Sequence, residues 1–375
     1  MANPPGATAR VIGRERELDA VIDFLESMSD GPALFLLEGE AGIGKTLLLQ
    51  QAIDQAKHRS YRVLTSRPVE SETKLSYAAL GDLLEPIVEQ ALPSLSAPQR
   101  RALEVALLRE EATGSLPDRR AVLLGALEVL RQAAASEPVF LAVDDLHWLD
   151  PPSAYALDFM IRRLAPEHVR VLATVRVGSD RAAVPLQRAL SEDNLTRLEV
   201  GPLEPAALDQ IIRARYGSSF PRGTLRELHG ASGGNPFVAL EMARVLLLRG
   251  GRHAPGEPLR APTSLDDLLH GRLAQLGPAT QDLLMILSAV AQPSSSMLRS
   301  VIGPGLVEEA MAEAVEAELV EAWRPRSIGP PVAGLGRLLE RSGGGPPCAA
   351  PSPGGGCTRS GGTRPPSCPG RPGSR

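Results

Sequence analysis

The sequence lacks the features of a secreted, disulfide-stabilised or membrane-spanning protein. Its three cysteines, Cys348, Cys357 and Cys368, stand near the C-terminus, and their spacings match no common zinc pattern. No run of about 18 apolar residues could form a transmembrane helix. The N-terminus, MANPPGATAR, has no apolar signal-peptide core. We therefore expect a cytoplasmic protein with a flexible segment at 1–10 and no membrane contact.

A strong excess of one charge is also missing. The chain has 40 Lys and Arg against 44 Asp and Glu, a net charge of -4. This balance argues against broad nonspecific binding to nucleic acid or anionic membranes. Lysine is scarce while arginine and alanine are abundant, which is typical of a GC-rich bacterial genome. The 375 residues are enough for two or three domains.

Short apolar runs alternate with helical patterns in the first half of the chain. A stripe of apolar residues over 14–28 and the segment 45–58 favour helices, and 76–136 is helical with breaks at prolines. This alternation predicts an α/β fold with a parallel sheet covered by helices on both faces. The expected strands are 33–39, 61–66, 139–145, 169–175 and 195–200.

The pattern becomes purely helical after Pro205. Helices are expected at 205–216, 222–231 and 236–249, and the composition of 249–262 is that of a linker. Further helices are expected at about 264–275, 279–291 and 306–318.

A glycine-rich turn, GEAGIGKT, joins the first strand to the following helix. It meets the spacing of a phosphate-binding loop, whose glycines let backbone N–H groups face phosphate oxygens beside a helix N-terminus. Lys45 is expected to reach the β- and γ-phosphates of ATP, and Thr46 to ligate Mg²⁺. The expected loop residues are Gly39, Glu40, Ala41, Gly42, Ile43, Gly44, Lys45 and Thr46.

Two acids follow the third strand in VFLAVDDLHW. Asp144 is expected to hold Mg²⁺, directly or through water, and Asp145 to polarise the attacking water as a general base. By themselves these acids could equally be exposed strand-end residues or helix caps. We expect His147 and Trp148 to serve packing and positioning rather than catalysis.

Two further segments can be interpreted either as ordinary structural features or as parts of the nucleotide site. Arg176 ends the fourth strand, where ligands of parallel sheets bind, but it could also be an ordinary surface arginine. The segment GGNPF fits a plain helix start, with Asn235 as cap and Pro236 in the first turn.

Five segments in fixed order resemble a known family. VIGRERELDAVIDFL, LLEGEAGIGKTLLL, LAVDDLHWLDPPS, VLATVR and GGNPFVALEMARVLL together look like the module of STAND-class signal-transduction ATPases. The closest subgroup is the ORC-like AAA type found in large bacterial LuxR-type regulators. The resemblance covers roughly residues 11–320.

This resemblance implies a P-loop ATPase domain at 11–203, a helical lid at 204–255 and a partial winged-helix region at 256–323. It also implies that Gly13 and Arg14 flank the adenine and that Arg176 reads the γ-phosphate. Pro236, in the family's G-x-P element, would touch the nucleotide from the lid. ATP and Mg²⁺ are the implied cofactors.

The resemblance stops at about Arg324. Residues 342–375 contain no Asp, Glu, Leu, Ile, Val or aromatic residue, so we expect 324–375 to be a disordered tail. Because the change falls inside a winged-helix pattern, the sequence looks truncated. A frameshift in a GC-rich gene is our favoured explanation, and a native disordered linker is the alternative. No DNA-reading domain follows, so we expect no direct DNA binding from this chain.

Several functions fit a phosphate loop in this setting. We expect a nucleotide-operated switch with slow ATP hydrolysis, whose partner is an unknown protein or a second copy on ATP binding. The alternatives are an AAA-type remodelling ATPase, a small-molecule kinase with its acceptor pocket in 76–136, and a non-functional truncated remnant.

Overall fold

The computed structural model describes most of the chain up to residue 320. The described residues are 11–27, 31–111, 117–164, 167–178, 190–248, 273–274, 276–289, 294–303, 305–317 and 319–320. The segments expected to be a flexible N-terminus (1–10), a linker (249–262) and a tail (324–375) lie outside them, as does most of the helix expected at 264–275.

The described strands form one parallel sheet in the order β2-β3-β4-β1-β5. This confirms the α/β fold expected from the sequence. β3 ends at Val143, so Asp144 and Asp145 follow the strand, and the expected 139–145 is too long by two residues. The strands are β1 (Ala33–Gly39), β2 (Arg62–Ser66), β3 (Val139–Val143), β4 (Val169–Arg176) and β5 (Leu195–Glu199).

Apolar side chains on both faces of the sheet build two separate cores. Successive side chains of a strand point to opposite faces, so neighbours enter different cores. In β1, Leu34 and Leu36 join one core, whereas Phe35 and Leu37 join the other. The near-continuous apolar runs of the central strands are the pattern of a parallel sheet buried on both faces.

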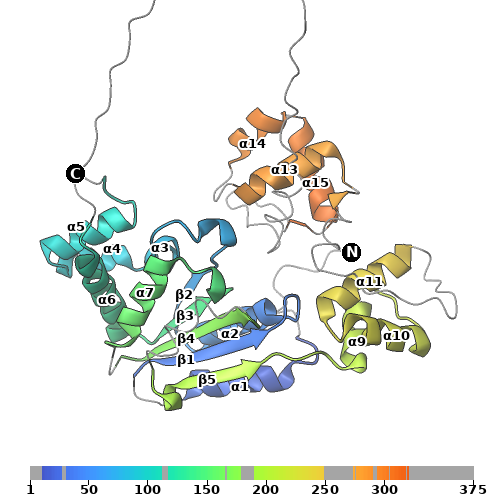
Figure 1. The fold of residues 1–375 in the computed structure, drawn as a ribbon, viewed down its shortest axis with the longest axis horizontal. Helices are drawn as coiled ribbons and strands as arrows, with labels where there is room; N and C mark the ends of the chain where they lie inside the picture. Colours follow the sequence, from blue (N-terminus) through green and yellow to red (C-terminus); the bar gives the residue numbers. More distant parts are fainter. Residues whose placement is uncertain are drawn as a thin grey trace, which may run out of the picture.

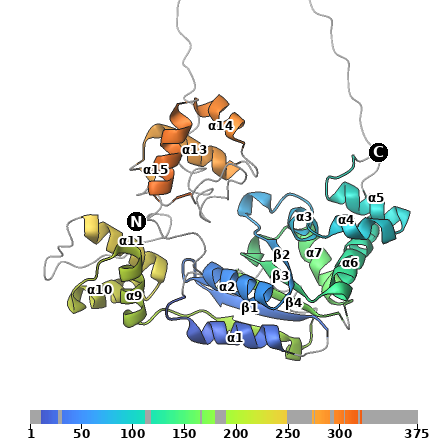
Figure 2. The ribbon, with the colours of Figure 1, turned by 180° about the vertical axis from the view of Figure 1, so that it is seen from behind.

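Helices cover both faces (Figures 1 and 2). The phosphate-loop helix α2 (Lys45–His58) and α1 (Glu15–Glu26) pack on the core of Phe35 and Leu37. The opposite core is covered by α3 (Ala78–Leu84), α4 (Val88–Ala91), α5 (Ala97–Ala106), α6 (Arg119–Ser136) and α7 (Pro151–Ile161). Because every strand pair in the sheet is parallel, every strand points its carboxyl end toward the same edge.

A three-helix unit lies beside that edge. It consists of α9 (Pro205–Tyr216), α10 (Arg222–Ser232) and α11 (Pro236–Leu248) and has its own apolar core. We refer to it as the lid. In Figure 1 the arrows of β1 and β5 point toward the lid.

A second helical unit follows the lid. Helices α13 (Pro278–Ala289), α14 (Ser295–Ile302) and α15 (Leu306–Glu316) enclose a separate apolar core. Phe237, at the start of α11, packs against that core. Among the described residues, no helix is long and apolar enough to cross a membrane.

Candidate functional site

The turn between β1 and α2 has the backbone that a phosphate loop requires. Gly42 and Gly44 adopt φ angles of 78° and 108°, which glycine reaches without strain. A Cβ added to Gly44 would meet no atom within 4 Å, so the space beside this residue is open. The N-terminus of α2 faces the same space and attracts anions through its unpaired N–H groups.

Lys45 is buried and lies over its own loop. Its Nζ donates hydrogen bonds to the carbonyl oxygens of Gly39 (2.9 Å) and Glu40 (2.8 Å). Burial lowers the pKa of Lys45, and the carboxylates of Asp145 and Asp144 oppose that shift. A cation that is desolvated and close to an open anion-binding turn gains stability when an anion enters.

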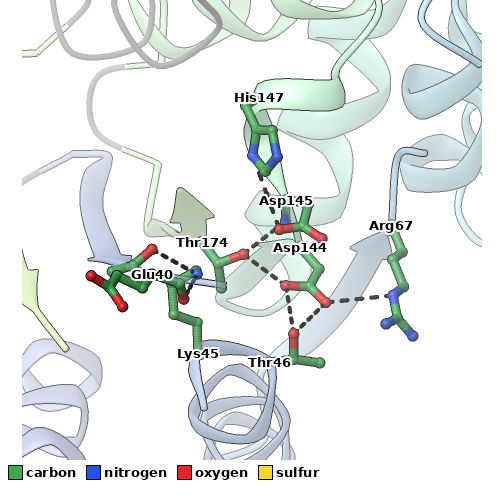
Figure 3. Close-up of polar contacts among 9 residues, drawn as sticks. Glu40, Lys45, Thr46, Arg67, Asp144, Asp145, His147 and Thr174 are labelled. Atoms are coloured by element: carbon green, nitrogen blue, oxygen red, sulfur yellow. Dashed lines mark hydrogen bonds and ion pairs between the residues drawn. The ribbon is translucent and has the colours of Figure 1, made fainter. Parts of the chain in front are cut away.

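Asp144 is the centre of a hydrogen-bonded network at the carboxyl ends of β3 and β4 (Figure 3). Thr46 Oγ1 donates to the Asp144 carboxylate at 3.0 Å, and Thr174 Oγ1 donates to Asp144 Oδ1 at 2.7 Å. The same Thr174 oxygen accepts the backbone N–H of Asp145 at 2.7 Å. One buried hydroxyl therefore orients both acids. Thr174 was not among the site residues expected from the sequence.

Asp145 has an unusual backbone conformation. Its φ is 52°, in the left-handed region that non-glycine residues seldom adopt, and such strain clusters at functional sites. Burial and the neighbouring Asp144 raise the pKa of its carboxyl group. Nδ1 of His147 lies 4.0 Å from Asp145 Oδ1. A carboxyl with a raised pKa next to an anion-binding loop fits the general-base role expected from the sequence.

Arg67 belongs to the site and was missed in the sequence. It follows β2, and its Nε lies 3.5 Å from Asp144 Oδ2 (Figure 3). Its position directly after a strand was the available signal, because the residues at the carboxyl ends of parallel strands meet at one edge.

Arg176 is the last residue of β4 and stands opposite Gly39 in the sheet register. Its side chain is exposed, and its positive charge helps to lower the pKa of Lys45. The structure thus places Arg176 beside the first residue of the phosphate loop, and its expected role as a γ-phosphate sensor stays a prediction.

Gly13 and Arg14 lie between the phosphate loop and the lid. Arg14 is buried, and its Nη2 donates to the carbonyl oxygen of Ile43 at 2.9 Å. Gly13 has φ 73°, and a Cβ there would come within 2.6 Å of Ala207 Cβ in α9. The visible role of both residues is therefore to join loop and lid, and their expected contact with adenine stays a prediction.

The segment GGNPF contacts the phosphate loop as well as starting a helix. Asn235 Oδ1 accepts the N–H groups of Phe237 and Val238, which confirms the cap. Its Nδ2 donates to the carbonyl oxygen of Ala41 at 2.9 Å. The sequence emphasised Pro236, which is half-buried at the first position of α11, but Asn235 makes the direct contact.

The oxygen donors at this edge fit Mg²⁺ bound with a nucleotide. Mg²⁺ prefers hard oxygen ligands and usually keeps waters and substrate phosphates in its octahedron. The Thr46 hydroxyl and the Asp144 carboxylate already lie together. Within the described part of the chain, no cluster of three or more His, Cys, Asp or Glu could hold a metal by itself.

Known proteins resemble this chain in sequence. Residues 10–172 match the model of the AAA ATPase domain. An uncharacterized protein of Rhizobium meliloti is 24% identical over 344 residues, which are 82% of this chain and 32% of that protein. This chain therefore spans about a third of the length of that relative.

One solved structure shows a similar fold. A Signal Transduction ATPase with Numerous Domains (STAND) protein with a tetratricopeptide repeat sensor, from Pyrococcus horikoshii, has a TM-score of 0.52 and 16% identity over 88% of this chain and 42% of that one. Cdc6p from Pyrobaculum aerophilum has a TM-score of 0.41 and 16% identity over 90% of this chain and 96% of that one. Residues 10–172, less than half of the chain, are thus similar to an AAA ATPase domain, and the P-loop NTPase-like fold is similar to that of a STAND protein.

Proposed function

We propose that this chain is an ATP-operated switch that hydrolyses ATP slowly and belongs to the regulatory ATPase part of a cytoplasmic signal-transduction protein. The observation that carries the proposal is the meeting of Lys45, Thr46 and Asp144 at one sheet edge, directly beside the lid. An ATPase whose phosphate loop touches a separate helical unit can report the bound nucleotide to that unit.

The residues of the site have distinct roles in this proposal. Lys45 binds the β- and γ-phosphates, and Thr46 and Asp144 hold Mg²⁺. Asp145 accepts a proton from the attacking water, and Arg176 contacts the γ-phosphate from the end of β4. MgATP, when bound, supplies the phosphoanhydride bond whose cleavage resets the switch.

The larger context of the chain is also a proposal. The sequence resemblance to LuxR-type regulators and the fold similarity to a STAND protein with a repeat sensor both support a signalling role. We propose transcription regulation as the output, and a protein partner or a second copy of the chain as the contact made with ATP bound. On this proposal α13–α15 are the start of a winged-helix domain.

Two measurements test the proposed switch together: the rate of ATP hydrolysis and the nucleotide-dependent protection of the lid against protease. We expect the purified chain to bind MgATP and to hydrolyse it at well below about 1 s⁻¹, the low end for ordinary enzymes. Limited proteolysis of the lid should differ between ADP and a non-hydrolysable ATP analogue. Arg176→Ala and Pro236→Ala should keep ATP binding but lose this difference. Rapid turnover stimulated by a substrate protein would instead indicate a remodelling ATPase.

A further inference from the structure

Each carbonyl oxygen of the phosphate loop from Gly39 to Ile43 accepts a hydrogen bond. Those of Gly39 and Glu40 accept from Lys45, at 2.9 and 2.8 Å. The next three, of Ala41, Gly42 and Ile43, accept from residues that do not belong to the loop. When N–H groups of a loop turn inward toward an anion, its carbonyls turn outward and need partners of their own.

The lid supplies two of these three partners. Asn235 Nδ2 donates to the Ala41 carbonyl at 2.9 Å, and the backbone N–H of Phe237 points to the Gly42 carbonyl at 3.4 Å. The third partner is Arg14, which donates to Ile43 at 2.9 Å. Asn235 is only 6% exposed, so water does not replace its amide easily.

The lid and the loop also fit each other sterically. A Cβ added to Gly42 would lie 2.8 Å from Phe237 Cβ and 3.1 Å from Asn235 Oδ1. Glycine is therefore required at position 42 twice, for its φ of 78° and for the close approach of α11.

Phe237 extends this contact to the second helical unit. Its backbone faces the Gly42 carbonyl, while its side chain packs on the core of α13–α15, which includes Leu283, Leu287 and Met311. One residue of α11 thus touches both the phosphate loop and the unit that follows the lid.

We propose that Asn235, with the backbone of Phe237 and the Arg14 guanidinium, holds the phosphate loop in its binding conformation, and that Phe237 links the loop to α13–α15. We call these contacts the carbonyl clamp. The inference rests on the proposed nucleotide site and adds positioning residues that need not touch the nucleotide.

The clamp has a thermodynamic consequence. A loop ordered before the phosphates arrive loses less conformational freedom on binding, so the docked lid raises affinity for any ligand that carries the phosphates. Coupling between two binding events is reciprocal. Bound nucleotide therefore stabilises docking of α11 by the same factor, and α13–α15 respond through Phe237.

Variants at 235 separate the clamp from the helix cap. Asn235→Ala removes both roles, whereas Asn235→Ser keeps a good cap residue whose short side chain does not reach Ala41. Phe237→Ala keeps the backbone N–H but removes the ring from the core of α13–α15. Asp118→Ala is the matched control, because it removes the cap of α6 away from the loop.

The test measures affinity and amide hydrogen exchange on the full chain. We expect Asn235→Ser and Asn235→Ala to weaken MgATP, MgADP and magnesium pyrophosphate equally, by about fivefold, as loss of one buried hydrogen bond does. Exchange at residues 40–46 should rise in the nucleotide-free Ser variant. Phe237→Ala should lose the nucleotide-dependent protection of α13–α15, and its nucleotide affinity should fall by no more than this lost coupling. Asp118→Ala should leave all these readings unchanged.

Two results would overturn the clamp. One is wild-type affinity and exchange in Asn235→Ser with a loss confined to Asn235→Ala, which would leave Asn235 as a cap only. The other is a nucleotide response of α13–α15 that persists in both Asn235→Ser and Phe237→Ala. Failure of the wild-type chain to bind any nucleotide would refute the proposed function, and the nucleotide-free exchange comparison would still decide the clamp.

Discussion

The candidate site has a phosphate-loop half, residues 39–46, and an acidic half, Asp144 and Asp145. The surrounding structure holds these two halves in different ways. The phosphate-loop half is supported by Arg14 and by Asn235 of the lid, whose positions are distant from the loop in the sequence. The acidic half is supported by the sheet itself, because Thr174 of β4 binds both Asp144 and the backbone of Asp145. The Asn235 contact can be released by moving the lid, whereas the Thr174 contacts belong to the sheet and cannot.

This difference assigns separate tasks to the two halves. β4 lies inside the sheet between β3 and β1, and Thr174 is fully buried, so Mg²⁺ binding and water activation would keep one geometry. The phosphate loop would change its affinity with the position of the lid. A switch needs one part that responds and one part that stays fixed.

The largest expected effect comes from removing the cation of the phosphate-loop half. Lys45→Ala should weaken MgATP binding by roughly 100-fold, because a buried charge-assisted contact to phosphate is lost. Isothermal titration of the purified variant measures this. Lys57→Ala is the matched control, since Lys57 is exposed at the other end of α2. Equal affinities in the two variants would mean that nucleotide binds elsewhere.

The next effect tests the fixed half. Thr174→Val is close to isosteric, but it removes the donor to Asp144 and leaves the buried N–H of Asp145 without its acceptor. We expect Mg²⁺-dependent ATP binding to weaken by about tenfold, with little change in lid protection. Magnesium titration at fixed ATP measures this, and Thr65→Val, on the exposed side of β2, is the control. A variant with wild-type magnesium dependence would show that the sheet does not position Asp144.

The fold could be predicted from the sequence because its signals are local. Buried strands such as 33–39 and 169–175 stand out as apolar runs, and alternation with helices dictates a parallel sheet. The ends of the elements were less certain. β3 stops two residues before the expected end, where Asp145 turns into a left-handed conformation that no pattern of hydrophobicity records.

The site was predictable where its residues share a motif and unpredictable where they meet only in space. Lys45, Thr46, Asp144 and Asp145 lie in two recognisable segments, and the structure brings them to one edge. Arg67 and Thr174 reach Asp144 from other strands, and the sequence offers no spacing that links them. Asn235 looked like a helix cap because its second contact, to Ala41, is 194 positions away.

A smaller effect concerns the charge of Asp145. Because burial and Asp144 raise its pKa, the native protein binds a proton there more readily than the unfolded chain does. The free energy of unfolding therefore falls as pH rises from about 4, the unfolded pKa, through the folded pKa. At pH values above the folded pKa, the protein is destabilised by the full difference between the two pKa values.

Asp145→Asn removes the destabilising buried charge of Asp145 together with the proposed general base. We expect slower ATP hydrolysis with binding kept, and a melting temperature of the nucleotide-free protein raised by a few degrees at neutral pH. The gain in melting temperature should vanish below about pH 4. Asp193→Asn, in the exposed 3₁₀ helix Glu192–Asn194, is the control. Wild-type turnover in Asp145→Asn would remove Asp145 as the base and leave the stability prediction standing.

The smallest expected effect is at Arg67, which joins the acidic half from its solvent side. Its guanidinium, 41% exposed, lies 3.5 Å from Asp144 Oδ2, one of the oxygens proposed to hold Mg²⁺. The two cations therefore compete for one carboxylate, and the exposed arginine side of the pair is screened by solvent, so the pair is worth little. Arg67→Ala should strengthen magnesium binding at fixed ATP by about twofold at low salt, with a smaller gain at high salt because ions screen the pair. Arg67→Lys keeps the charge and should stay near wild type. Weaker MgATP binding in Arg67→Ala would mean instead that Arg67 contacts the nucleotide, so the acidic half would also carry a residue that changes partner when ATP binds.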